Sequence, residues 1–210
     1  MTAIVAGSEF DRGLLGHDCW LELTNGERVE LPVERWTEDS GEGDEVLLDA
    51  CTGPTLDIGC GPGRLTAALT GRGIAALGVD SSHTAVRLTR RRGAVALRRN
   101  VFDRIPGEGR WRHALLADGN IGIGGDPSAL LRRAAELIAP DGDILIELDP
   151  PGQGLRHERV RLRPGHAEVG WFTWAWVDAD AIAGVAALAT LRVDWISRRG
   201  HRWFARLEKP

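Results

Sequence analysis

Three glycines at alternate positions, Gly59, Gly61 and Gly63, lie where a short apolar run meets a segment with helical periodicity. Glycine at such a turn permits a positive φ and lets a ligand approach the backbone closely. The helix that follows offers unpaired backbone N–H groups in its first turn. Asp80 ends the next apolar run, 21 positions after Gly59, where a carboxylate can accept hydrogen bonds from ribose hydroxyls. Together these features predict a binding site for a ribose-containing ligand.

The spacing of the glycines narrows the ligand class. Dinucleotide sites use G-x-G-x-x-G, in which the pyrophosphate lies at the helix N-terminus. This chain has G-x-G-x-G, and Arg64 occupies the place of the third glycine of the dinucleotide pattern. A dinucleotide is therefore disfavoured. A plain tight turn without a ligand is the structural alternative to a binding loop.

The segment "LDIGCGPG", followed by "ALGVD", resembles the class I (Rossmann-like) S-adenosylmethionine-dependent methyltransferases. The similarity runs from about residue 55 to about residue 151. It implies S-adenosyl-L-methionine as the cofactor, with the glycine loop behind its amino acid and ribose parts. It also implies that Asp57 helps to hold the loop and that the Asp80 carboxylate takes the ribose hydroxyls.

In this family a residue at the end of the third strand meets the adenine. In "NVFDRIP", Asn100 falls at that place with Val101 beside it, and Asp103 is the alternative if the register shifts. Cys60, inside the loop, is interpreted as a small filler and not as a nucleophile. The cofactor-binding set that the resemblance implies is Asp57, Gly59, Cys60, Gly61, Gly63, Asp80, Ser81, Asn100, Val101 and Asp118.

Residues that follow the fourth strand usually face the methyl group in the family, so Asp118 and Asn120 are candidates for contact with the substrate. The glycines around Asn120 predict either a flexible loop or a close approach to a ligand. "DPPG" follows the fifth strand, which is the wrong place for the amino-group methyltransferase signature. Asp149 in that segment is an open candidate for the pocket.

Four histidines are candidate bases: His17, His113, His157 and His166. His157 is included with Asp118 and Asn120 in the catalytic set, because a hydroxyl acceptor gains from a general base. His113 lies within an expected strand and is interpreted as structural. No pair of histidines has metal-ligand spacing, so no metal is predicted.

The region 151–177 is read as a substrate insertion. "RVRLRP" places Arg159, Arg161 and Arg163 on one face, which indicates either a charged edge strand or a clamp for an anionic substrate. "WFTWAW" concentrates aromatic side chains, which indicates either an aromatic substrate pocket or core. Its aromatic residues are Trp171, Phe172, Trp174 and Trp176.

The elements that must position these residues alternate between strand and helix from residue 55 onward. Such alternation predicts an α/β, Rossmann-like sheet of seven mostly parallel strands with helices on both faces. Expected strands lie at 55–59, 75–80, 94–102, 112–118 and 143–149, followed by two within 192–209. Expected helices lie at 64–73, 81–93, 126–142 and 178–191. Period-2 alternation on both sides of Asn25-Gly26 predicts an N-terminal β-hairpin. We therefore divide the chain into an N-terminal hairpin and cap segment, 1–50, and a methyltransferase domain, 51–210.

Composition limits the partners and the compartment. The 210 residues carry a net charge of −4, and residues 1–50 hold 13 Asp and Glu against three Arg. This balance makes nucleic acid an unfavoured partner. The arginine-rich, lysine-poor usage is typical of a GC-rich, bacterial genome. Three cysteines without CxxC spacing, and no apolar run of membrane length, predict a cytoplasmic protein with no membrane association.

The sequence thus predicts methyl transfer to O, N or C of a small molecule, either anionic or aromatic. One alternative is a nucleic-acid methyltransferase, which an arginine cluster over 87–99 would favour. The other is a non-methylating use of the same cofactor, as in a cyclase or a lyase. The identity of the acceptor and the oligomeric state stay open.

Overall fold

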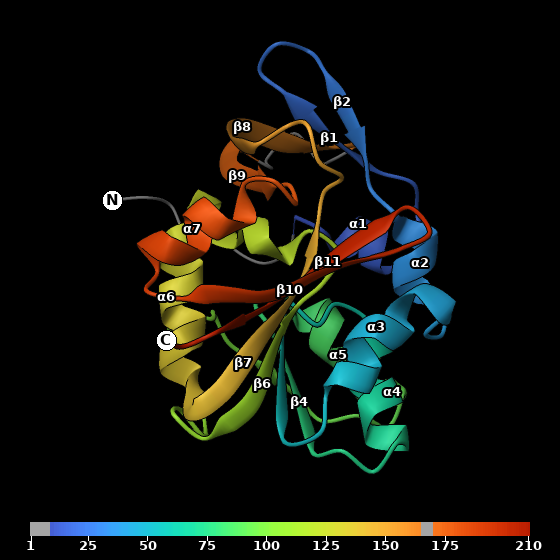
Figure 1. Cartoon of the computed structure of the whole chain (residues 1–210). Helices are drawn as coiled ribbons and strands as arrows, with labels where there is room; N and C mark the ends of the chain where they lie inside the picture. The colour runs from blue at the N-terminus through green and yellow to red at the C-terminus, as the bar shows by residue number, and fades with distance from the viewer. Residues whose placement is uncertain (1–8, 165–169) are drawn as a thin grey trace.

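A seven-stranded sheet in the order β10-β11-β7-β6-β3-β4-β5 forms the centre of the computed structural model, which describes residues 9–164 and 170–210. Its strands are β3 (Thr55–Ile58), β4 (Ala76–Asp80), β5 (Ala96–Arg98), β6 (Trp111–Leu116), β7 (Ile138–Leu148), β10 (Arg192–Arg199) and β11 (Arg202–Glu208). β3 to β7 run parallel, and β11 lies antiparallel between β7 and β10. The predicted mostly parallel α/β sheet is confirmed (Figure 1).

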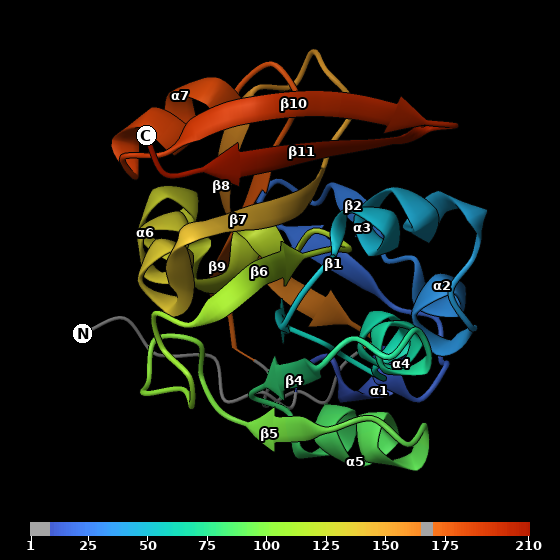
Figure 2. The ribbon, with the colours of Figure 1, turned by 60° about the horizontal axis from the view of Figure 1, so that its bottom comes forward.

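Helices cover both faces of this sheet (Figure 2). They are α3 (Glu45–Ala50), α4 (Arg64–Gly71), α5 (His83–Arg91), α6 (Pro127–Leu137) and α7 (Ile182–Leu188). In β7, Ile144 and Ile146 pack in the cluster that α6 and α7 cover, whereas Leu145 packs in the cluster under α3 and α4. Because alternate strand residues point to opposite faces, a sheet covered twice needs the continuous apolar run that β7 shows.

Two strand boundaries differ from the sequence-based expectation. β7 begins at Ile138, directly after α6, and not near residue 143, because Ile138 already pairs with Trp111 before the register shifts. His113 on β6 is structural, as expected. It is buried, its Nδ1 lies 2.7 Å from the Asp143 carboxylate, and its Nε2 accepts a 3.0 Å hydrogen bond from the Thr52 N–H.

A second, four-stranded antiparallel sheet has the order β2-β1-β8-β9. It combines the predicted hairpin, β1 (Trp20–Leu23) and β2 (Arg28–Glu30), with the insertion strands β8 (Leu155–Arg163) and β9 (Phe172–Val177). Gly26, in the hairpin turn, has a φ of +85° that favours glycine. The N-terminal segment and the insertion, more than a hundred residues apart, therefore share one sheet, which lies at the top of Figure 1.

β8 is an inner strand of this second sheet, so the expectation of a solvated edge strand is wrong. Arg161 and Arg163 both bind the Glu22 carboxylate on β1, with N–O distances of 2.8 to 3.0 Å. These two guanidinium groups lower the pKa of Glu22 to about 2. They are therefore already paired within the sheet, and they leave Arg159 as the exposed arginine of the strand.

The short helices α1 (Asp11–Leu14) and α2 (Val33–Thr37) and the turn η1 (Glu42–Asp44) complete the N-terminal segment. The Asp11 carboxylate accepts hydrogen bonds from the Ser82 and Thr84 hydroxyls, at 2.6 and 2.8 Å, at the start of α5. These bonds hold α1 against the core beside the glycine loop.

Candidate functional site

A cavity of about 630 Å³ lies between the carboxyl ends of the core strands and the second sheet. Its floor comes from β3, β4, β6 and β7, and its roof comes from β1, β9, α1 and α2. Most of the expected cofactor residues line it: Asp57, Gly59, Cys60, Gly61, Asp80, Ser81, Asn100, Val101 and Asp118. Ligands of open α/β sheets bind at this edge, so the cavity is the candidate site.

The glycine loop has the positive φ values that its sequence predicts, +71° at Gly59 and +52° at Gly61. A Cβ at Gly59 would lie 2.7 Å from Asn120 Nδ2, so the loop passes directly under this side chain. The Asn120 amide donates to the Ile58 and Gly59 carbonyl oxygens at 3.0 and 2.8 Å. The Asn120 side chain thus fixes the glycine loop, because its amide N–H groups point toward the backbone carbonyl groups of that loop.

Gly63 serves packing and lies outside the cavity lining, unlike the role expected from the resemblance. Its φ is +85° at the N-cap of α4, and a Cβ there would lie 2.5 Å from Thr89 Cγ2 on α5. The absence of a side chain lets α4 and α5 approach each other at the base of the loop.

The Asp80 carboxylate is fixed on the cavity wall by two backbone donors. Oδ2 accepts from the Gly61 N–H at 3.0 Å, and Oδ1 accepts from the Ser82 N–H at 2.8 Å. Burial raises the pKa of Asp80, although the backbone donors counteract it. Each carboxylate oxygen can accept further bonds, so the group is able to receive a diol.

Asp57 and Cys60 hold the loop from below. The Asp57 carboxylate is buried and accepts a 2.6 Å hydrogen bond from the Thr66 hydroxyl in α4. Burial raises the pKa of the Cys60 thiol, and its Sγ lies 3.7 Å from Thr89 Oγ1. A buried, protonated thiol is a poor nucleophile, which agrees with its interpretation as a filler.

Replacing Asp57 with asparagine is expected to stabilise the protein more at pH 7 than at pH 4. Burial raises the Asp57 pKa from 3.8 to about 6. Between these values the folded state binds more protons than the unfolded state, so the stability of the wild type falls as the pH rises. The difference amounts to about 3 kcal/mol, and the asparagine variant does not show it. Urea unfolding from pH 4 to pH 7 measures it.

Asp126→Asn is the matched control for this experiment, because the Asp126 pKa is lowered by its bonds to the Ala129 N–H and the Ser128 hydroxyl at the start of α6. For this variant the difference from the wild type is expected to stay nearly constant from pH 4 to pH 7, because the wild-type advantage is lost only as the pH falls below about 3.8. A free-energy difference between wild type and Asp57→Asn that stays constant from pH 4 to pH 7 would contradict the prediction.

The structure favours Asn100 over Asp103 as the residue at the end of the third strand. Asn100 and Val101 line the cavity, whereas Asp103 is exposed and lies outside the lining. Asn100 Oδ1 accepts a 3.0 Å hydrogen bond from the Phe102 N–H. This bond fixes the side chain at the end of β5 and leaves the amide N–H groups for a ligand.

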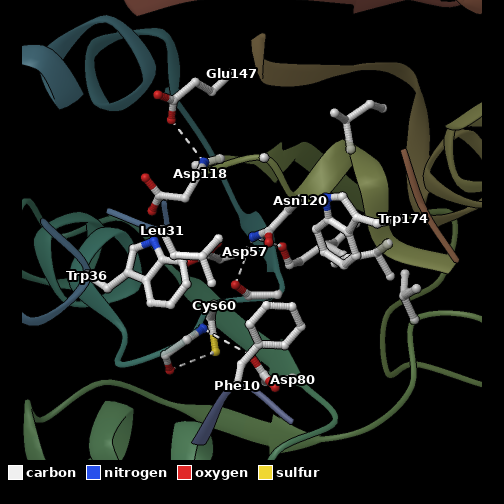
Figure 3. A pocket seen from close by; sticks show the side chains of 18 of the residues that line it. Phe10, Leu31, Trp36, Asp57, Cys60, Asp80, Asp118, Asn120, Glu147 and Trp174 are labelled. Atoms are coloured by element: carbon white, nitrogen blue, oxygen red, sulfur yellow. Dashed lines mark hydrogen bonds between the residues drawn. The ribbon is translucent and has the colours of Figure 1, made fainter. Parts of the chain in front are cut away.

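Asp118 is ion-paired on both carboxylate oxygens. Arg35 Nη2 lies 2.8 Å from Oδ1, and Arg64 Nη2 lies 2.6 Å from Oδ2. Asp118 has a φ of +53°, and its backbone N–H donates to Glu147 Oε2 at 2.9 Å, as Figure 3 shows. Two guanidinium groups therefore hold this carboxylate in place, and it is not a free base.

These pairs are part of a closed ring of alternating charges, which we call the charge ring. Its members, in order, are Asp118, Arg64, Asp44, Arg202, Glu147 and Arg35. Arg64 pairs with Asp44 as well as Asp118, and Arg202 binds Glu147 at 2.8 and 2.9 Å. Burial by itself lowers the pKa of Arg64. Its two carboxylate partners have the larger, opposite effect, so the pKa is raised overall and the guanidinium stays charged. The ring joins Arg35 and Asp44 of the acidic N-terminal segment to α4, the turn after β6, β7 and β11.

The histidines do not converge on the cavity. His157 is exposed on β8, with Nδ1 2.9 Å from the Gly125 carbonyl oxygen, and it does not line the cavity. We therefore remove it from the catalytic candidates. His17 is also exposed and outside the lining. His166 lies outside the described residues.

The aromatic cluster divides between cavity and core. Trp174 and Trp176 line the cavity, whereas Phe172 is buried and packs on Phe10 with a centroid distance of 5.9 Å. Trp171 lies outside the lining, with the Arg161 guanidinium 4.8 Å from its ring centroid. Phe172 is therefore core, and the interpretation as a substrate pocket stays a prediction for Trp174 and Trp176.

Phe10 and Trp36 are cavity residues that the sequence analysis missed. Phe10 lies immediately before α1, and Trp36 lies on α2. Their ring centroids are 6.4 Å apart. Phe10 also lies 5.6 Å from Trp174, so it joins the N-terminal segment to the insertion. Figure 3 shows Trp36 and Trp174 on opposite sides of the view with Phe10 between them.

The glycines after Asp118 allow close packing of η2 (Asn120–Gly125) against β9. A Cβ at Gly122 would overlap the Ala175 carbonyl oxygen and lie 2.5 Å from Trp174 Nε1. A Cβ at Gly125 would lie 2.5 Å from Thr173 Cγ2. This loop is therefore packed and not simply flexible.

Gly122→Ala is expected to destabilise the protein by about 1–3 kcal/mol, because a side chain there forces β9 away from η2. Thermal unfolding followed by tryptophan fluorescence measures the effect. Gly184→Ala in α7 is the control, since nothing lies within 4 Å of its Cβ position. If the two alanine variants had the same melting temperature, the packing role of Gly122 would be refuted.

With this geometry established, the chain can be compared with known proteins. Residues 55–142 match the family model described as "Methyltransferase domain". This part of the chain is a methyltransferase domain. The match covers the glycine loop, Asp80, Asn100 and Asp118, which are the residues on the floor of the cavity. A search of curated protein sequences finds none that matches this chain.

Solved methyltransferases share the fold. An S-adenosylmethionine-dependent enzyme from Bacteroides fragilis, solved with S-adenosyl-L-homocysteine, has 21% identity and a TM-score of 0.77, with 98% of this chain and 94% of that chain covered. The 1,6-didemethyltoxoflavin-N1-methyltransferase from Burkholderia thailandensis has 21% identity and a TM-score of 0.63, with coverages of 84% and 81%. The CcbJ methyltransferase from Streptomyces caelestis has 18% identity and a TM-score of 0.62, with coverages of 83% and 92%. At these identities the similarity establishes the fold.

The family match over residues 55–142 and the shared fold agree with the resemblance to class I methyltransferases, for which S-adenosylmethionine is the expected cofactor. The residues present fit this cofactor. The backbone of the loop is open at Gly61, where the nearest side-chain atom to a Cβ would be Leu14 Cδ2 at 3.5 Å. The Asp80 carboxylate lies beside it with capacity for further hydrogen bonds.

Over residues 9–164 and 170–210, no group of three or more His, Cys, Asp or Glu is arranged to hold a metal ion. Among the helices of the same ranges, none is both long enough and apolar enough to cross a membrane.

Proposed function

We propose that this methyltransferase transfers the methyl group of S-adenosylmethionine to an O, N or C atom of a small molecule. The observation that carries the proposal is the cavity itself. It extends from Asp80 on the core sheet to Trp174 and Trp176 under the second sheet. Its volume, about 630 Å³, falls in the range typical of small-molecule sites.

The floor residues would hold the cofactor. Asp80 and Ser81 would take the ribose, Asn100 and Val101 the adenine, and the backbone at Gly59 and Gly61 the amino acid part. When bound, S-adenosylmethionine supplies an activated methyl group on a sulfonium. The protein's task is then to orient the acceptor and to exclude water.

Asp118 serves this task by position. Its carboxylate is neutralised by Arg35 and Arg64, so it holds the turn after β6 in a fixed place. Asn120 joins that turn to Gly59, which keeps the loop and the turn in one rigid unit. These residues orient the reactants, and neither supplies the base.

A nucleic-acid substrate is not favoured by the arginine cluster. The Arg90 guanidinium donates to the Ala96 carbonyl oxygen at 2.9 and 3.3 Å. Arg92 pairs with Asp39 at 2.8 Å, and Arg98 donates to the Ser81 carbonyl oxygen at 3.1 Å. Half of the cluster is thus engaged within the chain, which leaves less free charge for phosphates.

The neighbours give limited support for the substrate class. The Burkholderia enzyme was solved with 1,6-didemethyltoxoflavin, and another neighbour is a glycopeptide N-methyltransferase. We propose a small-molecule acceptor here as well. The three free cysteines are buried, which is compatible with the cytoplasmic location that we propose.

Calorimetric titration with S-adenosylhomocysteine and with NAD tests the cofactor assignment. S-Adenosylhomocysteine is expected to bind and to raise the melting temperature, because it binds the native state selectively. NAD is expected not to bind. Binding of NAD alone would overturn the proposal.

Methyl-labelled S-adenosylmethionine separates methyl transfer from the alternatives. Label in a new small-molecule product supports the proposal. Label that stays on a cyclised or cleaved cofactor fragment would instead show a cyclase or a lyase, and label in added RNA or DNA would show a nucleic-acid substrate.

A further inference from the structure

Asp149 is a cavity carboxylate that receives no hydrogen bond from the described residues. It directly follows β7, lines the cavity and is half-buried. Within residues 9–164 and 170–210, no residue donates a hydrogen bond to its side chain or lies within ion-pair distance of it. Asp118, in the turn after the neighbouring strand β6, has two arginine partners, so the two carboxylates differ in their availability to a ligand.

The backbone of Asp149 is held firmly. Its N–H donates to the Val177 carbonyl oxygen at 3.0 Å, and its own carbonyl oxygen accepts from the Ala179 N–H at 3.1 Å. The chain exit that follows is fixed by the Asp178 carboxylate, which accepts from the N–H groups of Gly152 and Gly154 at 2.8 and 2.6 Å. Asp149 is therefore a positioned group and not part of a loose loop.

The walls of the same cavity carry aromatic side chains. Trp174 and Trp176 come from β9, and Phe10 and Trp36 come from the N-terminal segment. The Trp36 Nε1–H is buried and has no hydrogen-bond partner in the described part of the chain. Flat rings pack well against such walls, with centroid distances of about 4.5–7 Å.

Uncompensated burial of a carboxylate is costly, so a ligand that donates a hydrogen bond to Asp149 gains affinity. We propose that the methyl acceptor is a flat aromatic ring that carries an N–H or O–H group, held against the aromatic wall that Phe10, Trp36 and Trp174 form and donating this hydrogen to Asp149. The inference rests on the proposed methyl transfer and adds the class of acceptor and the proton acceptor.

The reaction balances with these groups. The bond from the ring nitrogen or oxygen to the methyl carbon forms while the sulfur–methyl bond breaks. The electron pair of the broken bond stays on sulfur. The N–H or O–H proton passes to the Asp149 carboxylate and from there to water.

The charges around Asp149 permit this role. Burial raises its pKa, and Glu147 on β7 and Asp178 after β9 raise it further. Arg156 on β8 lowers it, but this guanidinium also lies over the Trp176 ring at 5.4 Å and 3.5 Å from Glu27. The result is a pKa above 3.8, closer to the working pH of a proton acceptor than that of a free aspartate.

Ligand-detected NMR tests the proposal on the protein saturated with S-adenosylhomocysteine. The probes are phenol and indole, their methylated counterparts anisole and N-methylindole, and cyclohexanol as the non-aromatic counterpart of phenol. Phenol and indole are expected to bind about 10-fold or more tightly than anisole and N-methylindole, since a hydrogen bond to a charged group is lost on methylation. Cyclohexanol is expected to bind more weakly than phenol.

Two variants and two controls assign these preferences. Asp149→Ala is expected to remove the preference for phenol over anisole, whereas Asp141→Ala, exposed at the other end of β7, retains it. Trp36→Leu is expected to weaken all aromatic probes, whereas Trp20→Leu, on β1 outside the cavity lining, does not. In the wild type the preference is expected to increase with pH as Asp149 loses its proton.

Equal affinity for phenol and anisole, a preference that survives in Asp149→Ala, or no binding of any aromatic probe to the S-adenosylhomocysteine complex would each overturn the inference. These outcomes leave the proposed methyl transfer intact. Failure of S-adenosylhomocysteine itself to bind would instead refute the proposed function.

Discussion

Replacing Arg64 with methionine is expected to lower the free energy of unfolding by about 3–5 kcal/mol, because removing one partner of a buried ion pair leaves an uncompensated charge. The Arg64 side chain is 3% exposed and pairs with Asp44, which is 2% exposed, and with Asp118. Methionine fills a similar volume but leaves the buried Asp44 carboxylate with one of its two arginine partners, Arg202, and the Gly41 N–H. Urea unfolding at neutral pH measures the loss.

Arg72→Met is the matched control. Arg72 follows α4, the helix that Arg64 begins, and also pairs with two carboxylates, those of Glu45 and Asp49, but at the surface. Exposed pairs contribute little to stability, so this variant is expected to unfold close to the wild-type midpoint. Equal losses in Arg64→Met and Arg72→Met would show that the charge ring has no special stabilising role.

Replacing Asp80 with alanine is expected to weaken the binding of S-adenosylhomocysteine by about 10- to 150-fold, because a hydrogen bond to a charged group contributes roughly 1.5–3 kcal/mol. The carboxylate is placed for the ribose by the Gly61 and Ser82 N–H groups. Calorimetric titration measures the change in affinity. Asp103→Ala, at an exposed residue outside the cavity lining, is expected to bind as the wild type does.

Asp80→Ala also removes the acceptor of two backbone bonds, so the glycine loop could shift. Asp80→Asn separates the effects, because its side-chain oxygen can still accept a bond from the loop while the charge is lost. An intermediate loss of affinity in Asp80→Asn, with the melting temperature of the wild type, supports direct binding of the ribose. Unchanged affinity in a folded Asp80→Ala variant would exclude Asp80 from the site.

The charge ring changes the interpretation of Asp118. Its place after β6 and its presence on the cavity wall agree with the sequence analysis. Its two arginine partners, however, make it a positioning residue. Asp149, for which the described residues contain no such partner, is the proton acceptor that we propose instead.

Local sequence determined the core of this protein. The turn from β3 to α4 follows from the glycines, and the α6 N-terminus follows from Asp126, whose carboxylate accepts from the Ala129 N–H at 3.0 Å. The floor of the cofactor site could be predicted for the same reason. Gly59 and Asp80 are 21 positions apart, within one β-α-β unit, so periodicity and turn chemistry suffice to bring them together.

Only the tertiary structure decided the roof of the cavity and the charge ring. Leu21 on β1 pairs with Leu162 on β8, and Asp44 pairs with Arg202, across more than a hundred residues of chain in each case. No local pattern encodes such partners, because strand pairing and ion pairing between distant segments depend on how the helices and sheets pack. The sequence therefore determined where the glycine loop lies, whereas the fold determined which carboxylates of the cavity are ion-paired and which aromatic rings line its walls.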